Sequence, residues 1–159
     1  MSKLYISSSK QSSPQDYSFV KELLSKTTHY DIKEYTGGNF NVTDTDECEV
    51  IVIIPPANSK SNTDDIYIGR GQYDITVRAL DQNQTVIVYF DKEFHHVGSE
   101  EYIGENWQNE YGILFTTIRT CAFNKCIEER EKVLENKKKM KVTKNCLLPA
   151  YILFPNRFN

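Results

Sequence analysis

The segment Ile68–Ile75 holds the residue types best suited to binding an anion. Gly69 and Gly71 flank Arg70, and Asp74 follows three residues after the second glycine. Glycines let a backbone approach a ligand closely, and free N–H groups at the start of a helix favour negative charge. A guanidinium between them can pair with a phosphate or a carboxylate. The segment therefore predicts an anion-binding helix N-terminus, although a glycine-rich turn with an ordinary N-terminal acid gives the same pattern.

Six further residues extend the predicted ligand-binding set, because they lie in loops after apolar runs or in the same helix: Ser7, Ser8, Ser9, Pro55, Asn58 and Tyr73. Serine hydroxyls can bond a sugar or a phosphate, and a tyrosine ring can stack on a base. A polar loop and a core tyrosine explain the same residues without a ligand. Asp64 and Asp65 are alternative carboxylates, and His95-His96 can protonate a leaving base, but solvated loop positions are the simpler interpretation.

Strands that alternate with helices would position these residues. Buried strands are predicted at Leu4–Ile6, Glu49–Ile54 and Thr85–Phe90, and a roughly alternating strand at Tyr30–Tyr35. One helix follows Ser12 or Ser13, and another ends near Leu80. This alternation implies a mostly parallel sheet between helices. The predicted fold class is α/β: one Rossmann-like (flavodoxin-like) domain over residues 1–159, with about five strands. A ligand would bind beyond the carboxyl ends of the strands, in the loops Ser7–Ser13, Gly37–Asn41, Pro55–Gly71 and Asp91–His96.

The second half of the chain carries weaker patterns. Glu100–Gly112 is polar and irregular, and Ile113–Ile118 fits either a fifth strand or the start of a long helix. Ile127–Lys141 predicts a helix, because its acids mostly precede its bases and so match the helix dipole. Two prolines bracket the apolar segment Tyr151–Phe154, which predicts an edge strand or a packed tail.

Composition excludes several classes of protein. A chain of 159 residues with 39% hydrophobic and 12% aromatic content suits one globular domain rather than a disordered one. No apolar run is long enough to span a membrane, and no signal peptide is visible, so we expect a cytoplasmic protein with reduced cysteines. Cys48, Cys121, Cys126 and Cys146 form no CxxC pair and share no ligand spacing with the histidines, which argues against a metal site.

Charge is distributed unevenly along the chain. The net charge of −3 argues against a nucleic-acid partner. Arg119 to Lys144 contains nine Lys or Arg and four Glu, a net charge of +5 that leaves −8 for the rest. This basic segment can meet an anionic partner, but a solvated helix is the favoured interpretation.

From Asp46 to Phe90 the pattern resembles the nucleoside 2-deoxyribosyltransferase family and its wider relatives, the SLOG and TIR domains. In the deoxyribosyltransferases, a strand with a proline-containing loop leads to a glycine-rich turn. A helix that carries an acid then runs through an Ala-Leu pair into a further strand. The similar parts here are Val50–Pro56, Gly69-Arg70-Gly71, Asp74, Ala79-Leu80 and Thr85–Phe90, and Lys3–Ser9 with Asp16–Leu24 resembles the start of a TIR domain. The similarity covers about ninety residues.

These relatives bind or act on nucleosides or nucleotides. The resemblance implies that Asp74 stabilises or attacks the sugar C1′ while an N-glycosidic bond breaks, with no metal or organic cofactor. The family acid is Glu, and the spacing of the turn departs by a residue or two. The Asp74 side chain is shorter than that of the family Glu. The site therefore suits either an enzyme whose backbone lies closer to the sugar or a protein that binds the ligand without cleaving it. The resemblance also implies a homo-oligomer completed by the C-terminal tail, but Tyr151–Asn159 carries no acid, so packing on its own domain is favoured.

Three functions stay open, and each predicts a different site. A deoxyribosyltransferase-like enzyme predicts Asp74 facing a closed pocket. A non-catalytic nucleotide sensor predicts Arg70 and free backbone N–H groups converging on one anion. A small interaction protein that uses its basic helix or its tail predicts a crevice filled by its own side chains. The first two require a helix over Gly69–Leu80.

Overall fold

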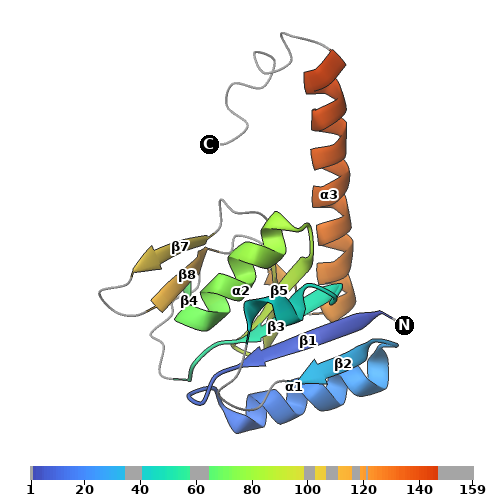
Figure 1. Cartoon of the computed structure of the whole chain (residues 1–159). Coiled ribbons are helices and arrows are strands. Elements are labelled where there is room, and N and C mark those ends of the chain that lie inside the picture. Colours follow the sequence, from blue (N-terminus) through green and yellow to red (C-terminus); the bar gives the residue numbers. More distant parts are fainter. Residues whose placement is uncertain are drawn as a thin grey trace.

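The chain is a mixed α/β protein in which helices flank a mostly parallel sheet (Figure 1). The computed structural model describes residues 2–34, 41–57, 65–98, 103–106, 111–115, 119–120 and 122–146. Within these residues there are a six-stranded sheet, a three-stranded sheet and three α-helices. The predicted site residue Asn58 and the predicted segment Tyr151–Phe154 lie outside the described residues.

The larger sheet has the strand order β2-β1-β3-β5-β6-β9. Its strands are β1 (Lys3–Ser8), β2 (Asp31–Glu34), β3 (Val50–Ile54), β5 (Thr85–Phe90), β6 (Glu93–Val97) and β9 (Arg119–Thr120). The first four pair in parallel, whereas β6 and β9 pair antiparallel. The prediction of a mostly parallel sheet is confirmed, and its four parallel strands lie where the apolar runs predicted them.

Each face of this sheet carries its own apolar core. Helix α1 (Pro14–Thr27) and the first turns of α3 (Phe123–Cys146) cover one face, where Leu4 and Ile6 are buried. Helix α2 (Arg70–Asp81) covers the other face, which includes Tyr5. Successive side chains of β1 therefore enter opposite cores, as the pleat of a strand requires. The Ser13 side chain caps α1 by accepting a hydrogen bond from the backbone N–H of Asp16 at 3.3 Å.

A second sheet corrects the prediction for the segment before α2. Pro55–Gly71 was expected to be a loop throughout, but Asp65–Gly69 forms strand β4. It pairs antiparallel with β8 (Tyr111–Phe115), which pairs with β7 (Ile103–Asn106). Ile66 and Ile68 alternate with polar neighbours and are fully buried against α2, which explains why this segment is a strand. The segment Ile113–Ile118 fits either a strand or the start of a helix by sequence. Its residues 113–115 belong to β8 of the smaller sheet, and residues 116–118 lie outside the described part of the chain.

The histidine pair also lies in a strand rather than in the expected loop. Strand β6 follows β5 through a two-residue turn, Asp91-Lys92, in which φ is 52° and 64°. Two positive φ angles match the type of turn whose twist suits a hairpin. His95 and His96 lie on opposite faces of the sheet, with 1% and 2% of their surface exposed. Their predicted role as solvated loop residues is wrong.

Helix α3 is the longest element and rises well beyond the sheet (Figure 1). Phe123, Cys126 and Arg130 are buried on its first turns, whereas Lys137, Lys138 and Lys139 are exposed. Among the described side chains, the helix therefore packs on the sheet through its N-terminal part. No described helix is long and apolar enough to cross a membrane.

Candidate functional site

The chain reverses its direction across the larger sheet at β1. Strand β2 lies on one side of β1, and β3, which follows β2 in the sequence, lies on the other side. In open α/β sheets, the loops at such a reversal part from each other and leave a crevice beyond the carboxyl ends of the strands. By this rule the crevice would lie between the carboxyl ends of β1 and β3, bounded by the loops that follow Ser8 and Ile54.

Gln72 joins this crevice to the start of α2. Its side-chain amide donates hydrogen bonds to the backbone carbonyls of Ser7, at 3.1 Å, and Ile54, at 2.8 Å. Its side-chain oxygen accepts a hydrogen bond from the backbone N–H of Gly69 at 3.0 Å. Only 4% of its surface is exposed. One side chain therefore holds together three of the segments that the sequence predicted to surround a ligand.

Ser12 fastens the same crevice from the side of α1. Its hydroxyl donates to the Ile54 carbonyl at 2.8 Å and accepts from the backbone N–H of Ser9 at 2.9 Å. The backbone N–H of Ala57 donates to the Gln11 carbonyl at 2.7 Å, which ties the two loops together. The innermost part of the crevice is thus filled by the protein's own Gln72 and Ser12 side chains.

Sequence reasoning missed Gln72 as a site residue. The positions Gln72, Ile75, Thr76 and Ala79 recur at helical spacing and are all buried. That spacing is the signal that could have found it, because a glutamine on the apolar stripe of a helix must bond other buried polar groups.

The predicted ligand-binding residues that the structure describes lie at this edge, but their environments differ. Ser7 and Pro55 are buried, Ser8 is exposed, and Ser9 is bonded to Ser12. Tyr73 is partly buried and packs against the core, which fits the alternative of a core tyrosine.

The glycine pair surrounds the start of α2. Gly69 is the N-cap residue, and its backbone N–H is already bonded to Gln72. Arg70 and Gly71 are exposed, and a Cβ placed on Gly71 would meet no atom within 4 Å. Open space for a ligand therefore lies outside Gly71 rather than beneath Gly69.

Asp74 is exposed on α2. Since Ile75 and Thr76 beside it face the sheet, Asp74 projects away from the core. The enzyme hypothesis predicts this carboxylate in a closed pocket, and neither of the two hollows described below is lined by it. Of the alternative acids, Asp64 lies outside the described residues, and the backbone of Asp65 begins β4.

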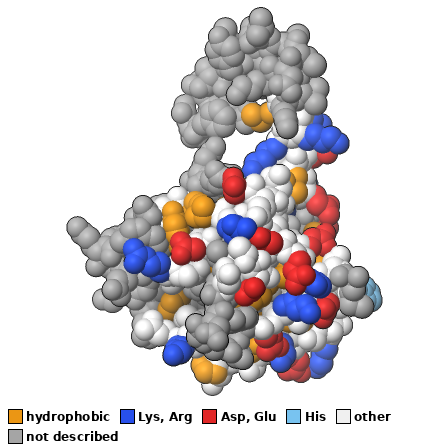
Figure 2. Space-filling model, viewed as in Figure 1, with side chains coloured by type: hydrophobic (Ala, Val, Ile, Leu, Met, Phe, Trp, Pro, Cys, Tyr) orange, Lys and Arg blue, Asp and Glu red, His pale blue; other side chains and the backbone are white. Residues whose placement is uncertain are grey.

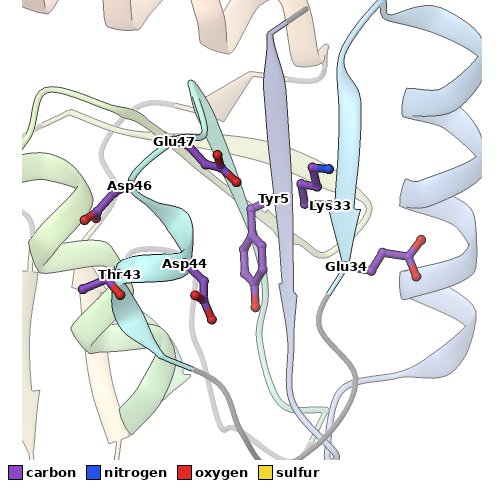
Figure 3. Close-up of a pocket in the computed structure, with 7 residues that line it drawn as sticks. All are labelled: Tyr5, Lys33, Glu34, Thr43, Asp44, Asp46 and Glu47. Carbon is purple, nitrogen blue, oxygen red and sulfur yellow. The ribbon is translucent and has the colours of Figure 1, made fainter.

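An acidic hollow of about 470 Å³ lies on the α2 side of β1 and β2, beside the 3-10 helix η1 (Val42–Thr45) (Figure 3). Its carboxylates are already bonded within the chain. Asp46 accepts two hydrogen bonds of 2.7 Å from Arg78, and Glu47 lies 2.8 Å from Lys3. Each cation lowers the pKa of its partner carboxyl. These two carboxylates therefore form ion pairs within the chain rather than facing a ligand.

Glu34 and Asp44 complete the acidic lining of this hollow. In Figure 3 the Glu34 side chain points away from it towards α1, where Lys21 lies 2.6 Å away. Asp44 accepts from the backbone N–H of Asn41 at 3.2 Å and so closes the capping box of η1. Both carboxylates have partners, as do Asp46 and Glu47.

A second hollow, of about 510 Å³, opens at the opposite edge of the sheet. It lies between the C-terminal end of α1, the residue before β3 and the first turns of α3, with Thr28, Glu49 and Asn124 among its lining residues. The two hollows and the crevice are therefore three separate places on the fold.

A buried polar pair lies where α3 packs on β6. Arg130 is fully buried, and one of its terminal nitrogens donates to the Gly98 carbonyl at 2.8 Å. Among the described residues, its other two guanidinium nitrogens and both ring nitrogens of His96 have no hydrogen-bond partner. Burial, with the nearby Arg130 as the second cause, lowers the pKa of His96 to about 4. His96 is therefore neutral at pH 7.

Within the described part of the chain, no three His, Cys, Asp or Glu side chains gather where they could hold a metal ion. Cys48 and Cys126 are free thiols buried in the two cores. Burial raises the pKa of the Cys48 thiol, which favours its protonated form.

No protein-family model matches the chain, and no curated protein or solved structure matches it significantly.

Proposed function

We propose that this chain is a nucleotide-binding protein of Rossmann-like (flavodoxin-like) fold, whose ligand lies over the carboxyl edge of β1 and β3. The observation that carries this proposal is the Gln72 bridge. It fixes the start of α2 against the ends of both strands, at the reversal of strand order. That is the usual place for nucleotides in doubly wound sheets. The resemblance to deoxyribosyltransferases and to SLOG and TIR domains implies the same ligand class.

The ligand would lie outside Gln72, because Gln72 and Ser12 occupy the inner crevice. Exposed Ser8, Arg70 and Gly71 border the outer space. Arg70 can pair with a phosphate, and the start of α2 adds the favourable end of the helix dipole. A nucleoside monophosphate offers both the anion for this end and hydroxyl groups for the serines.

The exposure of Asp74 favours binding over cleavage of an N-glycosidic bond. A carboxylate that stabilises an oxocarbenium-like sugar acts best where water is excluded, since solvent weakens the interaction. Asp74 is solvated in the free protein. We therefore assign it contact with a ribose hydroxyl, and glycosidic chemistry remains the alternative outcome of the test.

The test is a panel of nucleosides, deoxynucleosides, nucleoside monophosphates and NAD, read by thermal shift and by chromatography of released base. We expect a monophosphate near 100 times its Kd to raise Tm by roughly 5–10 °C without releasing base. Arg70→Gln should reduce this shift, whereas the control Asp81→Asn, an exposed acid at the far end of α2, should not. Base release by the wild type that Asp74→Asn abolishes would instead establish an enzyme.

The second candidate is an interaction protein that meets an acidic partner through α3. Two observations favour it: the filled inner crevice, and the exposed Lys137, Lys138 and Lys139 on the projecting part of the helix. Figure 2 shows Lys and Arg side chains on this part of α3, with Asp and Glu side chains also on the helix. This candidate predicts neither a rise in Tm nor released base with any compound of the nucleotide panel. It also predicts salt-sensitive binding of polyglutamate that is lost when the three lysines become glutamate.

A further inference from the structure

The hollow at the amino edge of the sheet has the chemistry of a cation site. It lies at the opposite ends of the strands from the proposed nucleotide edge, so it is a separate place on the molecule. Its volume of about 510 Å³ lies within the range of small-ligand pockets, about 300–1,000 Å³.

One wall of the hollow is apolar and fixed in orientation. Tyr30 is partly buried, and its ring meets that of Phe123 edge-on, with centroids 6.2 Å apart and an interplanar angle of 83°. Ile127, on the next turn of α3, lines the same hollow and is also partly buried. An aromatic face beside an aliphatic side chain suits a ligand with a short apolar body, and the ring attracts positive charge.

Two threonines at the rim of the hollow offer acceptors rather than donors. The hydroxyl of Thr27 donates to the Leu23 carbonyl at 2.7 Å, and that of Thr28 donates to the Leu24 carbonyl at 2.6 Å. Since each hydroxyl hydrogen is used within α1, only oxygen lone pairs remain to face a ligand. The C-terminal end of α1 adds the negative end of its dipole.

The carboxylates of Glu49 and Glu131, which lie near Tyr30, are not paired with any lysine that the structure describes, as other glutamates of the chain are. Within the described residues, Glu49 and Glu131 form no ion pair, whereas Glu22, Glu47, Glu128 and Glu129 each lie within 4 Å of a lysine. Burial raises the pKa of the Tyr30 hydroxyl, and the negative charges of Glu49 and Glu131 are the further causes of this rise. The local potential is therefore negative.

We propose that this hollow binds a small organic cation, a primary amine on a short aliphatic chain. Its ammonium group meets Glu49 and the threonine oxygens, and its chain lies against Tyr30 and Ile127. The three donors of one ammonium can bond the Glu49 carboxylate and both threonine oxygens.

The experiment is calorimetric titration of the full chain with n-butylamine, butanol and butyrate at matched ionic strength. Amide chemical shifts at Tyr30 and Asn124 report the place of binding. We expect saturable binding of the amine alone. Glu49→Gln should weaken it by roughly fivefold, the upper range for an exposed charge pair, and Asp81→Asn is the matched control. Asn124→Trp, a change at an exposed position that fills the hollow, should abolish it.

Three results would overturn the proposal. Equal binding of butanol would show an apolar hollow without charge selection. Unchanged affinity in Glu49→Gln would remove the carboxylate from the site. Absence of saturable binding by a wild type that melts cooperatively would show that the hollow takes no amine.

Discussion

At the scale of single residues, Gln72 holds the carboxyl edge together. Replacing it with Leu keeps the volume but leaves the buried Ser7 carbonyl and Gly69 N–H without this partner, while Ile54 keeps its bond from Ser12. A buried group left without a partner costs about 1–3 kcal/mol. We expect Gln72→Leu to lower the free energy of unfolding by about 2 kcal/mol in urea titrations. Gln72→Glu should cost more, because it directs a charge at two carbonyls.

The exposed Gln15→Leu is the control for this prediction, and a surface change of this kind should cost less than about 0.5 kcal/mol. Equal stability of Gln72→Leu and the wild type would show that the bridge does not form in solution.

Among the described residues, no carboxylate forms an ion pair with the buried cation Arg130. A second arginine in the chain offers a direct comparison, since Arg78 holds Asp46 through the same two nitrogens that have no partner in Arg130. Burying a charge without a counter-charge costs several kcal/mol of folding free energy. The single hydrogen bond to the Gly98 carbonyl stabilises the fold by less than that. We therefore expect Arg130→Met to raise the free energy of unfolding by at least about 1 kcal/mol in urea titrations. A loss of about 3 kcal/mol would instead reveal a paired Arg130.

The pKa of His96 makes stability depend on pH. Its pKa is about 4 in the fold against 6.5 in the unfolded chain, so the unfolded chain takes up the proton first as pH falls. The fold should keep its full stability above about pH 6.5 and lose up to about 3 kcal/mol between pH 6.5 and 4. Urea midpoints across this window should fall for the wild type and stay nearly level for His96→Leu.

The exposed His29→Gln is the matched control and should retain the wild-type slope. The paired carboxylates of Glu34, Asp46 and Glu47 have lowered pKa values, so their contribution is lost at lower pH, below about 4.5. A wild-type profile that is flat down to pH 4.5 would contradict the burial of His96.

At the scale of elements, apolar runs predicted β1, β3 and β5 well, because these strands are buried on both faces. Strands β3 and β5 also read as continuous, mostly β-branched segments. Strand β4 was not predicted, because it lies beside a polar loop and belongs to a separate sheet. The alternation of Ile66 and Ile68 with their neighbours is the pattern that could have indicated it. The β5–β6 hairpin escaped because Asp91-Lys92 lacks the glycine that usually marks such a turn.

This turn also gives a prediction, since Lys92 holds φ at 64°, which costs an ordinary residue about 1–2 kcal/mol. Lys92→Gly should therefore raise the free energy of unfolding by about 1 kcal/mol, measured by thermal or urea unfolding. Lys125→Gly, in the regular helix α3, should lower it by a similar amount. Destabilisation by Lys92→Gly would show that the turn has a different conformation.

At the scale of the whole molecule, the sequence predicted where the site segments meet but not what fills the space between them. Parallel topology alone brings Ser7, Pro55 and Gly69 to one edge. The depth of the crevice depends on the side chains of Gln72 and Ser12, whose long-range bonds no local pattern specifies. The amino-edge hollow was also missed, because Tyr30, Glu49 and Asn124 meet only in the folded chain.

The most direct measurement is an amide chemical-shift map of the full chain titrated with AMP and, separately, with NAD. The account predicts saturable shifts at Ser8, Arg70, Gly71 and Asp74, with Tyr30 and Asn124 unmoved. Shifts confined to other parts of the fold, or none at millimolar ligand, would contradict nucleotide binding at the carboxyl edge.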